Sequence, residues 1–160
     1  CVRQGDNLII TSDSYGGWNR HFEWIAESVD SQNGIIDMEG QTDRQFATEA
    51  GPGEPMFAAE VVNLRRDIIF EGQKDDPDSK HGAHFMIFHT PDVKQTISGV
   101  HFTNFGQGGN IGRYPIHFHI CGPSPSLVSK NVITNSNQRC VMIHNTNNVT
   151  IEDNVAYKTK

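Results

Sequence analysis

Apolar residues in this 160-residue chain occur in short runs of about four to six, separated by Gly, Asn, Pro and Asp. Runs of this length with alternating polar positions are typical of β-strands, and long helical periodicity is absent. The best helical candidate, 57–64, is cut short by the β-branched residues that follow. The pattern predicts strands at 7–11, 22–29, 34–38, 60–64, 67–70, 85–89, 96–102, 116–120, 131–134, 141–144 and 149–151.

The second half of the chain repeats itself. Four similar triplets begin 32, 32 and 23 residues apart: Asp67-Ile68-Ile69, Gly99-Val100-His101, Asn131-Val132-Ile133 and Asn154-Val155-Ala156. One such unit cannot bury its apolar face alone, whereas stacked copies can, which is the physical basis of a solenoid. We therefore expect an all-β parallel β-helix, with Asn131 and Asn154 stacked as an Asn ladder. An antiparallel β-sandwich is the alternative, and it explains the repeat less well.

The first 50 residues differ from the rest and contain both tryptophans, Trp18 and Trp24. They predict the end of a small β domain or cap over 1–50, followed by β-helix coils over 51–160. A turn-rich stretch at 51–55 would join the two. Neither end of the chain has terminal character, so we expect a segment of a longer protein.

Histidines recur beside the predicted inward residues of the coils. Strand residues alternate between faces, so in 116–120 the apolar residues point inward and leave His117 and His119 together on the outer face. Alignment of the coils places Phe88, Phe118 and Ile143 at equivalent inward sites. Their neighbours His89, His119 and His144 would then form a column, with strands about 4.8 Å apart.

Such a column has three possible meanings. The imidazoles could bind zinc or another divalent metal, calcium included, and leave one position open. Alternatively, a histidine could act as general acid or base while Arg113 or Arg139 neutralises a substrate carboxylate. The third meaning is a row of solvated polar residues. His84 and His101 are expected to be structural.

The charge and hydropathy of the chain limit the kinds of partner that it could bind. The net charge is −6, with no basic run, which argues against nucleic acid. No apolar stretch approaches the roughly 20 residues of a membrane span.

The cysteines leave two alternatives open. Cys121 and Cys140 could form a disulfide with Cys1 paired elsewhere, or all three could be reduced. Asn148 begins the Asn-Val-Thr glycosylation sequon.

Two strings resemble a known family. They are Gly112-Arg113-Tyr114-Pro115-Ile116-His117-Phe118-His119 and Asn137-Gln138-Arg139-Cys140-Val141-Met142-Ile143-His144. Both are similar to the signature of the cell migration-inducing and hyaluronan-binding protein and transmembrane cell-surface hyaluronidase family. The resemblance implies an extracellular, right-handed, pectate-lyase-like β-helix and, in the animal hyaluronidases, depolymerisation of hyaluronan. The loop 121–126 is shorter than the Asp- and Gly-rich insertion of those enzymes.

Two functions follow as hypotheses. The first is a secreted or cell-surface module that binds polysaccharide or glycoprotein glycans and depolymerises an acidic polymer such as hyaluronan. The second is a non-catalytic structural or adhesive segment that contacts other segments of the same large protein. For the first, the assigned residues are His117, His119, Arg113 and Tyr114 (catalytic), Arg139 (substrate-binding) and His89, His119 and His144 (metal).

Overall fold

The computed structural model describes residues 2–11, 21–41, 46, 59–74, 76 and 78–160. Every regular element in these residues is a β-strand, which confirms the all-β prediction. The described part of the helical candidate contains strand β4 (Val61–Asn63), which lies within the strand predicted at 60–64. The chain forms two compact units, Cys1–Arg65 and Arg66–Lys160. The predicted boundary between residues 50 and 51, the 51–55 stretch and Trp18 lie outside the described residues.

The first unit contains an antiparallel sheet of β1 (Asn7–Ile10), β2 (Phe22–Asp30), β3 (Ile35–Met38) and β4. The strand order is β3-β2-β1-β4, with β1 between β2 and β4. After Asn7, β1 is apolar, and its Leu8, Ile9 and Ile10 are buried. Burial of these side chains on a central strand holds the sheet together.

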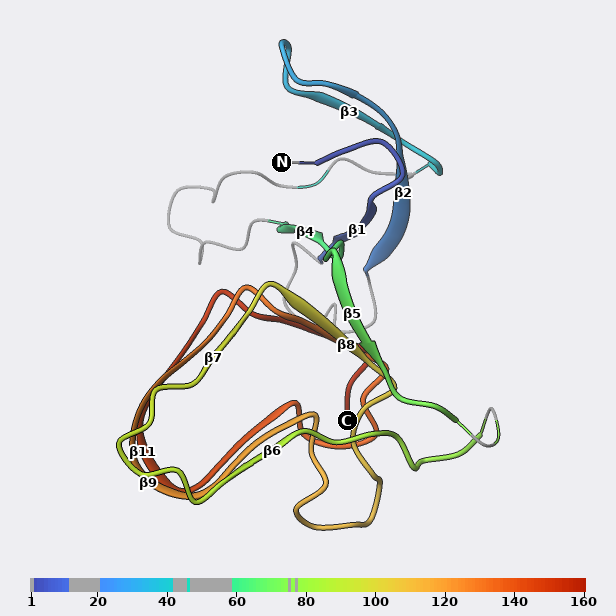
Figure 1. Cartoon of the computed structure of the whole chain (residues 1–160). Coiled ribbons are helices and arrows are strands. Elements are labelled where there is room, and N and C mark those ends of the chain that lie inside the picture. The colour runs from blue at the N-terminus through green and yellow to red at the C-terminus, as the bar shows by residue number, and fades with distance from the viewer. Residues whose placement is uncertain (1, 12–20, 42–45, 47–58, 75, 77) are drawn as a thin grey trace, which may run out of the picture. The chain divides into compact units, whose positions relative to one another are not determined.

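The second unit consists of parallel sheets (Figure 1). One sheet has the order β12-β10-β8-β5, and the other has the order β11-β9-β6, with β7 also paired to β9. The chain visits the two sheets in turn, so strands far apart in sequence lie side by side. The parallel pairing excludes the antiparallel sandwich for this unit. The strands are β5 (Ile68–Glu71), β6 (Met86–Phe88), β7 (Thr96–Ser98), β8 (Val100–Thr103), β9 (Ile116–Ser129), β10 (Val132–Thr134), β11 (Val141–Glu152) and β12 (Val155–Tyr157).

Two stacked asparagines, one buried and one half-buried, link neighbouring strands, as the ladder prediction expected. Asn131 is fully buried, and its amide nitrogen donates to Asn154 Oδ1 at 3.0 Å and to the Ile97 carbonyl at 2.9 Å. Its Oδ1 accepts from the Val100 amide at 3.0 Å. Asn131 therefore satisfies backbone groups at a corner where the sheet ladder has ended.

The repeated triplets align only in part. Ile68 pairs with Val100, and Val132 pairs with Val155, as the repeat predicts. Between β8 and β10, however, Val132 lies opposite His101, one residue away from the predicted match with Val100. This shift brings the fully buried Phe102 and Ile133 side by side in the core.

Corners in successive strands share a left-handed backbone conformation. His89, Ile120 and Asn145 have φ values of 46°, 54° and 46°, and they follow paired strand segments of β6, β9 and β11. β9 and β11 are long because each turns this corner while remaining paired, with register shifts in β11 after His144 and after Asn147. The corner thus ends the straight segment that carries the histidines.

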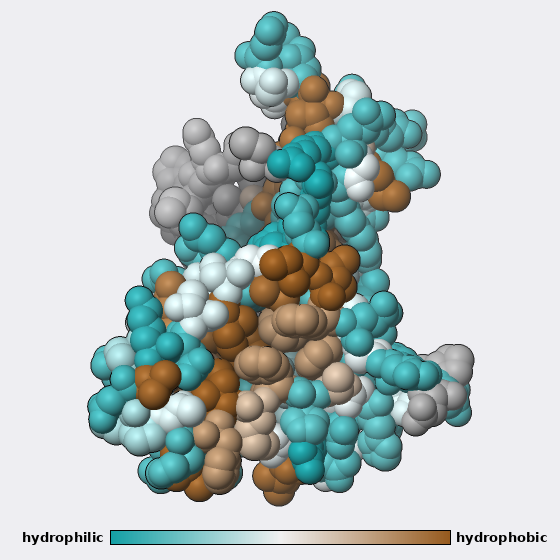
Figure 2. Space-filling view, in the orientation of Figure 1, coloured by the Kyte–Doolittle hydropathy of each residue, from teal (hydrophilic) through white to brown (hydrophobic). Residues whose placement is uncertain are grey.

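The core of the second unit lies between its sheets. Phe102, Ile116, Phe118 and Val128 are almost fully buried there, with Cys121 among them. At the edge, Ile68, Ile69 and Phe70 of the outermost strand β5 are exposed, and Figure 2 shows apolar side chains gathered over this part of the unit. Cys121 and Cys140 are both free thiols, so the disulfide alternative for this pair was wrong.

Candidate histidine site

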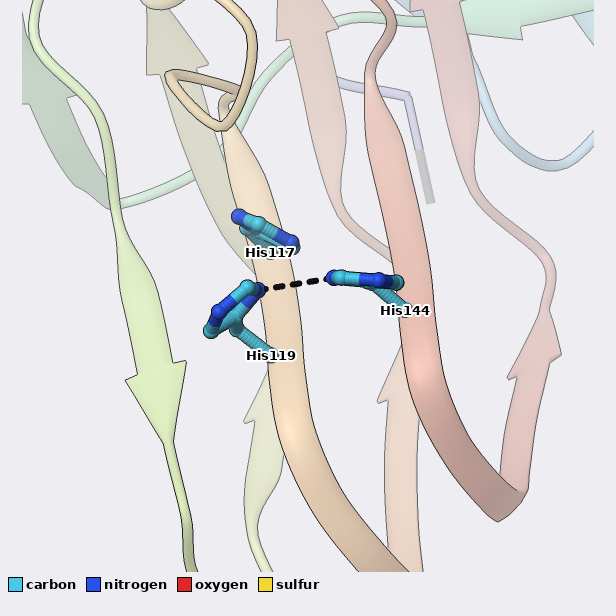
Figure 3. Close-up of side chains that lie close together, drawn as sticks. All are labelled: His117, His119 and His144. Atoms are coloured by element: carbon cyan, nitrogen blue, oxygen red, sulfur yellow. Dashed lines mark hydrogen bonds between the residues drawn. The ribbon is translucent and has the colours of Figure 1, made fainter.

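Three histidines converge on the outer face of the β9–β11 sheet. His117 and His119 come from β9, and His144 comes from β11, where it lies directly opposite His119. Figure 3 shows the three rings pointing toward one another, with His119 Nδ1 and His144 Nδ1 2.9 Å apart. One potential ligand atom from each ring lies within 4.8 Å of the others. The predicted neighbourhood of His117, His119 and His144 is therefore present.

The prediction that His89 forms the third member of the histidine column was wrong. Strand β6 places Phe88, not His89, opposite His119, and it buries Ile87 where Phe88 was expected. Phe88 is 60% exposed, and its ring stacks on His119 with centroids 5.3 Å apart. A one-residue slip exchanges the two faces of a strand, and packing of Ile87 in the core selected this register. His89 lies at the corner, with Nδ1 3.3 Å from the Ile120 carbonyl.

His117 is held rigidly beneath the other two rings. It is 2% exposed, and its Nδ1 lies 2.9 Å from the Gly112 carbonyl. Because a carbonyl oxygen only accepts, Nδ1 carries the hydrogen and Nε2 has the free lone pair. Nε2 is buried and has no hydrogen-bond partner. Burial lowers the pKa of His117, as do nearby His119, His144 and His84, while the Gly112 carbonyl opposes the shift.

The loop before β9 supports this arrangement. Tyr114 is buried, and its ring meets the His117 ring edge-to-face at 5.1 Å. This position makes Tyr114 a packing partner of His117, and its catalytic role stays a prediction. Gly106 has φ 84°, and an added Cβ would lie 2.9 Å from the Gln138 backbone nitrogen. The loop that contains Gly106 is therefore packed closely against the segment that precedes β11.

Arg113 connects a fourth histidine to the site. Its Nη1 donates to His84 Nε2 at 2.6 Å, so His84 presents its lone pair to the guanidinium. Burial and the Arg113 charge both lower the pKa of His84. The sequence assigned His84 a structural role, and no spacing signal linked it to Arg113, because the two residues are 29 positions apart.

Two other predicted residues lie at the surface. Arg139 is exposed and precedes Cys140, whose carbonyl accepts from the Ile116 amide at 3.1 Å. Its substrate-binding role stays a prediction. Asn148 is exposed in β11 with φ 64°, and its glycosylation also stays a prediction.

The corner next to the site contains backbone strain. Ile120 follows His119 and has φ 54°, a conformation that costs a β-branched residue roughly 1–2 kcal/mol. We expect Ile120→Asn to raise the free energy of unfolding by about 1 kcal/mol, measured by urea denaturation, because Asn tolerates this conformation. The reverse change in the same corner column, Asn145→Ile, should lower it by a similar amount. A loss of stability in Ile120→Asn would show that packing of this 38% exposed side chain outweighs the strain.

Comparison with known proteins places the chain in a family. A sequence model described as the CEMIP beta-helix matches residues 80–160, half of the chain, and the chain belongs to this family. Protein rliB of Dictyostelium discoideum is 31% identical over 98% of the chain, and a G8 domain-containing protein of the same organism is 35% identical over 66%. The cell surface hyaluronidase of Danio rerio is 25% identical over 97%. The chain spans only 15%, 9% and 12% of these relatives.

Proposed function

We propose that this chain is part of a secreted or cell-surface protein. The surface formed by His84, Arg113, His117, His119 and His144, called the histidine face below, binds an acidic polysaccharide such as hyaluronan in this proposal. In this proposal the parallel sheets of the second unit are coils of a right-handed β-helix. The family match and the similarity to a protein named cell surface hyaluronidase support it. Among the described residues, no helix is long and apolar enough to cross a membrane.

The observation that carries the proposal is the position of an exposed guanidinium beside the histidines. The whole chain has a net charge of −6, yet Arg113 lies here next to His84 and close to the three clustered histidines. Arg113 is exposed and uses one donor on His84, which leaves further N–H groups for a ligand. A planar guanidinium held by a neutral histidine is suited to bind the carboxylate of a uronic acid.

Phe88 adds a second feature that suits a sugar. Its ring is largely exposed and continues the row of rings formed by His119 and His144 across three neighbouring strands. Binding sites for organic ligands combine apolar and aromatic surface with a few placed polar groups. We propose that the apolar face of a sugar ring rests on Phe88 while its carboxylate meets Arg113.

Hydrolysis at the same face is the enzymatic form of the proposal. The oxygen of water would bond to the anomeric carbon as the bond from that carbon to the bridging oxygen breaks. One proton leaves the water and one reaches the bridging oxygen. The histidines would take up the first proton and supply the second.

Binding to hyaluronan oligosaccharides, measured by calorimetry on the 160-residue chain, tests the proposal. We expect Arg113→Ala to weaken binding by about tenfold or more, because a charge-assisted hydrogen bond contributes roughly 1.5–3 kcal/mol. Arg3→Ala removes the same charge from an exposed position in the first unit and should leave binding unchanged. Uncharged dextran should not bind. Equal binding by wild type and Arg113→Ala would contradict the assigned site.

The structural alternative is supported by the Asn ladder and the continuous core, which by themselves justify much of the sequence. It makes a different prediction in the same experiments. Absence of hyaluronan binding, together with unchanged polymer length after incubation, would favour the structural alternative. Binding without a change in length would support a glycan-binding module that is not an enzyme.

A further inference from the structure

We propose that His117, His119 and His144 bind a single transition-metal ion, for which zinc is the test ion. The inference rests on the proposed function only for its biological role, because the ion would then lie within the polysaccharide site. The ligand set differs from the predicted one: His117 replaces His89, which lies at the corner with Nδ1 directed to a backbone carbonyl.

The three rings lie near the spacing that such an ion needs. Zinc–nitrogen bonds of about 2.0–2.1 Å in tetrahedral geometry place ligand nitrogens about 3.4 Å apart. One nitrogen from each of the three histidines already lies within 4.8 Å of the others, and His119 Nδ1 and His144 Nδ1 are 2.9 Å apart. Small rotations of His119 and His144 about their soft terminal torsions would supply the difference.

His117 provides an independent observation. Its Nδ1 donates to the Gly112 carbonyl. A backbone carbonyl commonly orients a metal-bound histidine in this way and leaves Nε2 as the ligand. Nε2 is buried without a hydrogen-bond partner, although a buried unsatisfied polar atom is costly. A metal ion bound to this nitrogen would remove the cost. Tyr114 packs on the ring edge-to-face and limits its movement.

The donor set also indicates which metals fit. Three imidazole nitrogens suit zinc, nickel or copper, whereas calcium takes six to eight oxygen ligands. The cluster contains no carboxylate, so it does not match calcium, the other divalent ion considered from the sequence. Three protein ligands leave one position open, and a polysaccharide carboxylate or a water oxygen could occupy it.

Calorimetric titration tests the inference: zinc alone is added to the metal-free 160-residue chain, and the heat of binding is measured. We expect one ion per chain and a higher Tm in its presence. Cobalt should give the visible absorption of a tetrahedral site. His144→Ala and His119→Ala should each weaken zinc binding at least about 100-fold, since each removes a direct ligand. His144 is exposed, so its replacement is not expected to prevent folding.

His89→Asn is the matched control, because Asn tolerates the corner conformation and His89 lies outside the cluster. It should leave zinc binding unchanged. Lack of zinc binding by the wild type, or equal affinity in His144→Ala, would overturn the inference. Zinc is added without polysaccharide, and hyaluronan binding is measured separately with and without a chelator. Zinc binding without hyaluronan binding would therefore leave the metal site standing and remove only the proposed function.

Discussion

Phe118→Ala is expected to lower the free energy of unfolding by about 3–5 kcal/mol, because it leaves a cavity in a core that relaxes only partly. Phe118 is 0% exposed and lies between the two β9 histidines, with its ring on the inner face of the strand. Equilibrium denaturation in urea on the 160-residue chain measures the loss. The change should also disturb the platform from which His117 and His119 project.

Phe88→Ala is the matched control for Phe118→Ala. It removes the same ring from the neighbouring strand, but Phe88 is 60% exposed and mainly contacts His119. We expect a loss of at most about 1 kcal/mol, in line with one aromatic contact. Equal losses in the two variants would contradict the assignment of Phe118 to the core and Phe88 to the surface.

Asn131→Ala is expected to destabilise the chain by about 2–5 kcal/mol. The change leaves the Val100 N–H and the Ile97 carbonyl without the partners they have in the ladder, and it removes the bond to Asn154. A buried group deprived of its partner costs roughly 1–3 kcal/mol. The midpoint of urea denaturation measures the effect.

Asn147→Ala tests whether the loss comes from the ladder. Asn147 is an exposed asparagine in β11, so its replacement should change stability by no more than about 0.5 kcal/mol. A small effect in Asn131→Ala would instead show that water or a shifted side chain satisfies the two backbone groups.

Much of the second unit could be predicted because its sequence pattern is local. Alternation of apolar and polar residues located β6 and β10 within one residue at each end. The predicted strand 96–102 merged β7 and β8, and the predicted strand 116–120 gave only the first part of β9. Asn131 and Asn154 precede equivalent strands, and an amide is the side chain that can bond to copies of itself above and below. The ladder therefore followed from the repeat alone. The match of His119 with His144 followed from the same repeat, and it was confirmed.

The site was predicted less completely, because its remaining parts depend on contacts between distant segments. The sequence predicted Phe88 as the inward residue, and only the fit in the core showed that Ile87 is buried instead. The bond between His84 and Arg113 joins two loops that no periodicity relates. Likewise, the Gly112 carbonyl that orients His117 comes from an irregular loop, whose path is set by packing of Tyr114.

The sequence by itself therefore determined the all-β character, the stacking of repeats and the outward pair His117 and His119. Each of these follows from the side-chain alternation of a strand or from the need of a repeat to bury its apolar face. The tertiary structure decided the register of β6, the burial of His117 and the group of three rings. These depend on which of several near-equivalent packings fills the core, and that choice is made by contacts among residues far apart in the chain.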